Sequence, residues 1–175
     1  MNLCAVIVAL MPVAYHGQPA WFDTMLAGYA FEYDEQHRPI TVHDAKTGFY
    51  LVRSVDCDGA FVRLLLTRDR KLVSEMGVGV PGFNDADPYE IAVEKPLPSL
   101  STGKGLKIGD SEARMRALLG SPSKASVEGS RSQFRVCSYK WKSPKNKDDI
   151  SVTYDQRYTF KAGRLIEVEF WKSAD

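Results

Sequence analysis

Cysteine, histidine and net charge are all scarce in this chain of 175 residues. It contains three cysteines and three histidines, and its 23 basic residues nearly balance its 22 acidic ones. A formal net charge of +1 argues against a general nucleic-acid binder, because such proteins gain affinity by neutralising many phosphates. None of His16, His37 and His43 has a cysteine or carboxylate at the spacing that a helix would convert into a metal site. We therefore expect no bound metal and no cofactor.

Catalytic motifs are equally hard to find. The sequence has no G-x-S-x-G, no H-E-x-x-H and no phosphate-binding glycine loop. Two acid-rich stretches, residues 56–59 and 84–90, are the remaining candidates for chemistry, and a small hydrolase or metal-binding enzyme built on them is the alternative hypothesis. Neither follows the EF-hand spacing, and Asp and Asn in such turns commonly bond their own backbone. We therefore expect no catalytic residues and predict that the protein is not an enzyme.

No apolar run is long enough to span a bilayer. The longest, residues 3–14, has the length of a signal-peptide core, and Ala14 and Ala20 offer cleavage points. No Lys or Arg precedes the run and Pro12 lies near the first cleavage point, so a buried N-terminal strand and a retained anchor stay open. We interpret residues 1–20 as a signal peptide or apolar N-terminal segment, which predicts a periplasmic or secreted protein.

Export would also explain the cysteine count. Cys4 lies inside the apolar run, and its removal would leave Cys57 and Cys137 as an even pair. In an oxidising compartment these two thiols are candidates for a disulfide. Two separate buried thiols are the other reading of the same pair.

The overall composition is that of a soluble globular protein, with 44% hydrophobic and 26% charged residues. Residues 1–100 carry 8 basic and 13 acidic side chains, a net of −5, whereas residues 101–175 carry 15 and 9, a net of +6. This asymmetry fits either two halves of one fold that attract each other or a basic surface for an acidic partner.

The first half of the chain is predicted to be an antiparallel β-meander over residues 21–81. A short helix or irregular segment at 19–29 leads into it, and Asp58-Gly59 and Arg68–Arg70 are predicted hairpin turns. Residues 82–102 are rich in proline and are predicted to be a linker. The predicted strands have period-two patterns and cover residues 40–43, 48–55, 60–67 and 71–80.

Residues 103–175 are predicted to form a helix followed by three antiparallel strands. The helix covers about 110–119, because Asp110 and Ser111 can cap it and Gly120 can end it. Met115, Leu118 and Leu119 share one face of it. The strands cover 133–141, 150–160 and 165–171, and a Lys161–Arg164 turn joins the last two. In the final strand, Ile166, Val168 and Phe170 are predicted to face the core, and Glu167 and Glu169 to face water. The predicted fold class is α+β, with the helix packed on one face of antiparallel sheet.

Residues 103–171 carry a recurrent pattern of glycines, a helix stop and a closing hairpin. The segments are GLKIGDSEARMRALLGSPSK, a strand ending in SYKW, and YTFKAGRLIEVEF. The pattern resembles the small outer-membrane-assembly lipoproteins of the SmpA/OmlA type and the related repeat of the β-lactamase inhibitor protein. The resemblance implies helices packed on an antiparallel sheet and a role in binding proteins, and it implies no active site. The residues that carry it are Gly105, Ile108, Gly109, Leu119, Gly120, Pro122, Phe160, Gly163, Arg164 and Leu165.

Together these patterns predict a non-catalytic extracytoplasmic protein that binds a protein or a component of the cell envelope. The aromatic residues Tyr139, Trp141 and Trp171 are candidate partner-binding side chains. The sequence leaves open which partner is bound and what oligomeric state the protein adopts.

Overall fold

The computed structural model describes residues 22–31, 39–55, 61–76, 91–122, 124–128, 131–142 and 151–174. For residues 91–92, 124–128, 131–142, 151–153 and 173–174 it describes the backbone. The ten strands are β1 (Met25–Leu26), β2 (Tyr29–Ala30), β3 (Ile40–Asp44), β4 (Phe49–Val55), β5 (Phe61–Thr67), β6 (Ile91–Glu94), β7 (Lys124–Glu128), β8 (Arg131–Lys142), β9 (Ser151–Lys161) and β10 (Arg164–Ala174). The two helices are α1 (Arg70–Glu75) and α2 (Glu112–Leu119). Among these residues no helix is long and apolar enough to cross a membrane.

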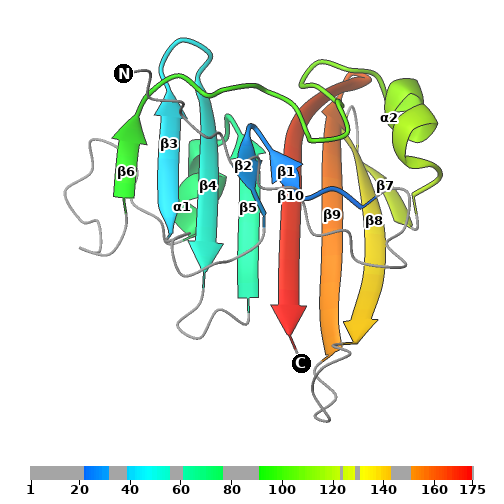
Figure 1. Ribbon diagram of the computed structural model, residues 1–175. Coiled ribbons are helices and arrows are strands. Elements are labelled where there is room, and N and C mark those ends of the chain that lie inside the picture. The colour runs from blue at the N-terminus through cyan, green and yellow to red at the C-terminus, as the bar shows by residue number, and fades with distance from the viewer. Residues whose placement is uncertain are drawn as a thin grey trace, which may run out of the picture.

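One eight-stranded sheet dominates the molecule, in the order β6-β3-β4-β5-β10-β9-β8-β7 (Figure 1). Every pairing in it is antiparallel except that of β3 with β6. The predicted α+β class is confirmed, and β3–β5 form the predicted meander. The C-terminal strand β10 lies between β5 and β9, so both halves of the chain share a single sheet.

Helix α1 covers the first part of a stretch that is predicted to be a strand over residues 71–80, so that prediction is wrong over 71–75; residues 77–80 lie outside the described residues. The Asp69 carboxylate accepts hydrogen bonds from the backbone N–H groups of Lys71 and Leu72, which starts a helix in place of the predicted hairpin turn. Val73 is then buried against Tyr50, Val52 and Leu65 on one face of the sheet. Because a run as short as Leu72-Val73 has no periodicity of its own, the cap and the sheet surface decided between strand and helix.

Helix α2 is where the sequence predicts it. The Ser111 hydroxyl accepts a hydrogen bond from the backbone N–H of Arg114, and Gly120 ends the helix with φ 83°. Met115 and Leu119 are buried in the main core. The Lys161–Arg164 turn is also confirmed, with left-handed Ala162 and Gly163 between β9 and β10.

The main core lies on the face of the sheet opposite α1. Its centre is a group of aromatic rings: Phe22 meets Tyr154 edge-on at 5.0 Å between centroids, and Phe31 meets Phe170 at 5.9 Å. Tyr158 is fully buried there and donates a hydrogen bond to Gln156, whose amide donates to the backbone carbonyl of Asp23. This buried polar chain connects β9 to the segment that precedes β1.

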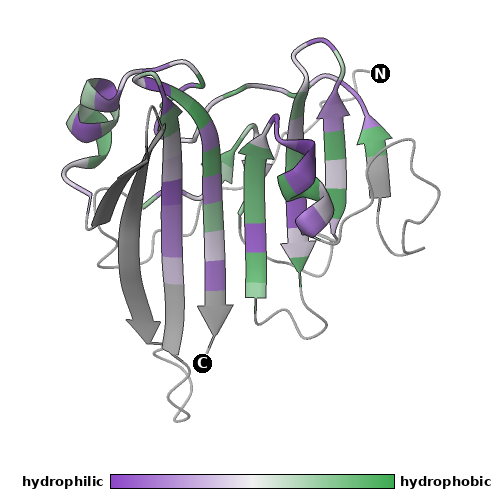
Figure 2. Cartoon of the chain, turned by 180° about the vertical axis from the view of Figure 1, so that it is seen from behind, coloured by the Kyte–Doolittle hydropathy of each residue, from purple (hydrophilic) through white to green (hydrophobic). Residues whose placement is uncertain are grey.

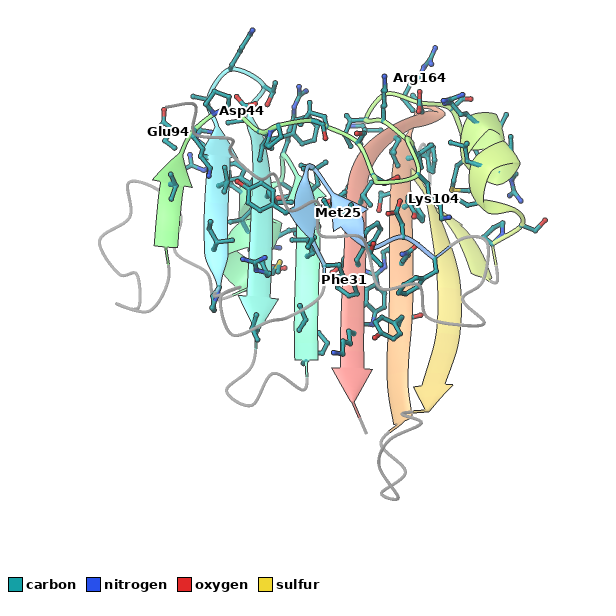
Figure 3. All side chains as sticks on the ribbon, viewed as in Figure 1. Met25, Phe31, Asp44, Glu94, Lys104 and Arg164 are labelled. Atoms are coloured by element: carbon teal, nitrogen blue, oxygen red, sulfur yellow. The ribbon has the colours of Figure 1, made fainter. Side chains whose placement is uncertain are left out.

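The β1–β2 hairpin and the segment from 95 to 111 cover this core. Figure 3 shows Met25 and Lys104 in front of the sheet, and Asp44 and Glu94 at its upper left. Gly103 donates its N–H to the Met25 carbonyl at 2.8 Å, and Lys104 donates its N–H to the Asp23 carboxylate at 2.7 Å. Leu97 and Leu106 point into the core from this segment. The predicted linker therefore supplies β6 and part of the core cover.

Candidate binding face on the sheet

Strand β10 carries two buried glutamates on the face of the sheet opposite the main core. A β-bulge between Leu165 and Glu167 shifts the alternation, so Leu165, Val168 and Phe170 enter the core while Ile166 stays outside it. Glu167 is only 5% exposed and Glu169 only 3%. The prediction that Ile166 faces the core and that both glutamates face water is therefore wrong. Side chains from neighbouring strands remove the glutamates from solvent.

Two arginines hold the Glu169 carboxylate from opposite sides. Arg63 of β5 donates its Nε–H to Oε1, and Arg157 of β9 forms an ion pair with Oε2, from which its Nη1 lies 3.1 Å away. The side chains of Arg63 and Arg157 are 29% and 33% exposed, whereas that of Glu169 is 4% exposed. Each arginine thus covers the carboxylate while part of its own guanidinium group reaches solvent.

Aromatic side chains complete this site. The Arg157 guanidinium lies over the Trp171 ring at 4.9 Å from its centroid, a cation–π contact. A shallow hollow of about 160 Å³ lies among the five side chains. We call this set the arginine face: Phe61, Arg63, Arg157, Glu169 and Trp171.

A second hollow lies beside Glu167, near the end of β5 and the β9–β10 turn. Its carboxylate accepts hydrogen bonds from the hydroxyls of Thr67 at 2.9 Å and Thr159 at 3.2 Å. The hollow has a volume of about 460 Å³ and mixes apolar with charged walls. On one wall, the Arg68 guanidinium carbon lies over the Phe49 ring, 4.4 Å from its centroid. The other lining residues are Thr67, Asp69, Ile108, Lys161, Ile166 and Glu167.

The arginine face is uncovered by the described elements. Figure 2 shows α1 in front of β4 and β5, with no helix or strand in front of β9 and β10. The hairpin β1–β2 and the segment from 95 to 111 lie on the other side of the sheet (Figure 1). A partner would therefore reach this face without moving any described element.

The strand register adds two more basic positions at the same level of the sheet. Glu169 pairs with Arg157, Arg157 pairs with Arg135, and Arg135 pairs with Lys124. The row from β10 to the β7 edge therefore contains one acidic and three basic residues.

Of the three aromatic residues predicted to bind a partner, the structure places one in this site. For the other two it describes the backbone alone. Trp171 belongs to the arginine face and pairs with Asp155. Tyr139 pairs with Tyr154, and Trp141 pairs with Val152, after a register shift in β8. A partner-binding role for these three residues stays a prediction.

Other predicted sites lie wholly or partly outside the described residues. These are residues 1–20, the acid-rich stretches 56–59 and 84–90, and Cys57; for Cys137 the structure describes backbone pairing with Asp155. His43 is described, and its ring stacks on Tyr50 at 4.4 Å. Across the described ranges, no three His, Cys, Asp or Glu side chains converge as metal ligands would. The disulfide and the alternative enzyme hypothesis therefore stay predictions.

Sequence reasoning missed Arg63, Arg157 and the burial of Glu169. The alternation of Glu167 and Glu169 with apolar residues indicates a strand with one polar face. It does not indicate which cations stand beside them, because β5 and β10 are about a hundred residues apart in sequence, as the 106-residue separation of Arg63 and Glu169 shows. The opposite charges of the two halves are the one signal in the sequence that these strands could meet.

No family model matches this chain, and no curated protein or solved structure matches it either. The geometry of the described residues is therefore the basis for the functional proposal.

Proposed function

We propose that this protein is a non-catalytic extracytoplasmic binding protein that holds a protein partner against the arginine face. The observation that carries the proposal is a hollow that no described helix or strand covers, in which Arg63 and Arg157 flank the buried Glu169 beside Phe61 and Trp171. Arginine and tryptophan are among the residues that contribute most to protein–protein interfaces.

The rigidity of the face supports this role. Phe61, Arg63, Arg157, Glu169 and Trp171 all lie on three neighbouring strands in the middle of the sheet. Because ion pairs and the cation–π contact already hold both guanidinium groups, little side-chain freedom remains to be lost on binding. Sites on strands are also positioned more accurately than sites on loops.

The location is proposed from the sequence. The apolar run at 3–14 has the length of a signal-peptide core, and residues 103–171 resemble modules of exported proteins that bind other proteins. Intact mass of the protein isolated from its source cells tests this part. A product shortened near Ala14 or Ala20 supports export, whereas a full-length product in the cytoplasmic fraction contradicts it.

The binding role is tested by comparing how much partner protein is captured by the wild-type protein and by two variants. Trp171→Ala removes the aromatic wall of the arginine face, and Arg114→Gln removes an arginine from α2, which packs on the opposite face of the sheet. A specific partner is retained by wild type and by Arg114→Gln and is lost from Trp171→Ala. Retention by all three folded proteins would place the binding surface elsewhere.

A further inference from the structure

The two arginines of the arginine face have more hydrogen-bond donors than Glu169 uses. A guanidinium group has five N–H donors and pairs best with a carboxylate through two parallel bonds. Here Arg63 gives Glu169 one hydrogen bond, from its Nε–H, and Arg157 meets it as an ion pair through Nη1. The Nη groups of Arg63 make no hydrogen bond to the part of the chain that the structure describes. Donors therefore remain for a second anion.

The local charge favours the same conclusion. Arg63, Arg157 and Glu169 together give the hollow a net charge of +1. The register also places Arg135 directly opposite Arg157, and Lys124 directly opposite Arg135. This arrangement fits a protein that meets a negative charge at this face.

The size of the hollow limits what that anion can be. A volume of about 160 Å³ suits one or two side chains rather than a long ligand. Phe61 and Trp171 offer aromatic surface beside the guanidinium groups, which suits an apolar neighbour of the anionic group. A nucleic acid fits less well, because its affinity comes from many phosphates and this hollow has room for one or two side chains.

We infer that the arginine face binds an acidic segment of the partner protein, in which an Asp or Glu side chain lies between Arg63 and Arg157 and an apolar neighbour packs on Trp171. The inference rests on the proposed function and names the chemistry of its partner. Glu169 then has a second role: it reduces the net charge of the arginine pair, so that binding stays reversible.

The experiment selects short random peptides displayed on phage against the full-length protein. The peptide that is selected most often is then synthesised with a fluorescent label, together with a matched peptide in which Asn and Gln replace Asp and Glu. Binding is measured by fluorescence anisotropy at low and at high salt. We expect acidic and apolar residues side by side in the selected peptides, about a tenfold or greater loss of affinity in the amide peptide, and weaker binding at high salt.

Variants of the protein test the assignment of the arginines. Arg63→Gln and Arg157→Gln should each lower the affinity for the acidic peptide by about tenfold or more. Arg114→Gln should leave that affinity unchanged. Glu169→Gln should strengthen binding, because it raises the charge of the hollow from +1 to +2. A purely structural role for Glu169 predicts no such gain. Far-UV circular dichroism establishes that each variant is folded, and the amide peptide gives the same test without altering the protein.

The outcomes separate this inference from the proposed function. Neutral peptides that bind wild type and lose affinity for Trp171→Ala would overturn the acidic partner while keeping the binding face. Selected peptides that bind Trp171→Ala as well as wild type would overturn both. Displacement of the acidic peptide by a short single-stranded oligonucleotide at lower concentration than by its own unlabelled form would favour nucleic acid and overturn the inference.

Discussion

A single carboxylate, that of Asp44, attaches the segment after β6 to the β3–β4 turn. Oδ1 accepts backbone hydrogen bonds from Lys46 and Thr47, and Oδ2 accepts one from Leu97 across 53 residues of sequence. Burial alone would raise the pKa of this carboxyl group. The Thr47 side chain and the backbone N–H groups of Leu97, Thr47 and Lys46 outweigh burial and lower the pKa below its ordinary value of 3.8.

Because its pKa is lowered, Asp44 stabilises the folded state at neutral pH and loses this effect in acid. Because the folded state favours the charged form, the contribution is complete above about pH 4 and is lost as the pH falls through the lower folded pKa. We expect Asp44→Asn to lower the melting temperature at neutral pH and to reduce its further fall between about pH 5 and about pH 2. Thermal unfolding followed by circular dichroism across this range measures both effects. If the melting temperature of the variant falls at low pH as steeply as that of wild type, the role assigned to Asp44 is contradicted.

Tyr158 makes the corresponding prediction for alkaline pH. Burial, and then the charge of Asp23, raise the pKa of its hydroxyl well above the ordinary value of 10.0. The folded state therefore favours the neutral hydroxyl. Its contribution to the free energy of unfolding is complete below about pH 10 and is lost as the pH rises further. Tyr158→Phe should show a shallower loss of stability above about pH 10 than wild type. At neutral pH it should cost about 1–2 kcal/mol, because Gln156 loses a buried donor. Urea unfolding at several pH values tests both statements.

At the scale of single elements, capping and contact with the sheet matter more than intrinsic periodicity. Helix α1 begins at the Asp69 cap and buries Val73 on the sheet, although its sequence also suits a strand. The β1–β2 hairpin depends in the same way on its surroundings. Its turn contains left-handed Ala27 and Gly28, and its edge bonds to residues 101–103.

Gly28 and Gly48 form a matched pair for testing how the hairpin packs. Both have positive φ, 84° and 71° respectively, so an alanine at either costs about 1–2 kcal/mol of backbone strain. A Cβ at Gly28 would also lie 2.8 Å from the Cβ of Pro98, whereas a Cβ at Gly48 would meet no atom within 4 Å. We expect Gly28→Ala to cost about 1–3 kcal/mol more than Gly48→Ala. Equal losses in urea unfolding would show that the contact with Pro98 is unimportant.

At the scale of the whole molecule, β10 makes one cooperative unit of two parts of the chain. It pairs with β5 through six residue pairs from Val168↔Leu66 to Ser173↔Phe61, and with β9 on its other side. The main core contains residues from both parts, among them Phe31, Leu64, Tyr158 and Phe170. Loss of packing at β10 should therefore destabilise the whole sheet.

Phe170→Ala tests this cooperativity. The side chain is fully buried in the ring cluster with Phe31 and Tyr158, so its loss should cost about 3–5 kcal/mol. Urea unfolding curves from far-UV circular dichroism and from tryptophan fluorescence should shift together and remain superimposable. Two separate transitions would show that residues 21–81 and 103–175 unfold as independent domains.

Local signals in the sequence were enough for the α+β class, the β3–β5 meander, helix α2 and the Lys161–Arg164 turn. Caps, glycines and short-range periodicity act within a few residues, so their effect can be read without knowing the fold. The same rules gave the wrong structure at Arg70–Glu75, where a strand pattern and a helix cap compete. They also placed Glu167 and Glu169 in water, because alternation identifies the second face of a strand without revealing what covers it.

Local signals specify which segments form strands and helices across most of the described fold, because capping and side-chain alternation act within a segment. Tertiary structure alone decided the order of the strands, the bulge in β10 and the meeting of Arg63, Arg157 and Glu169. The reason is that an ion pair between strands depends on register, and register is set by the packing of a core drawn from the whole chain.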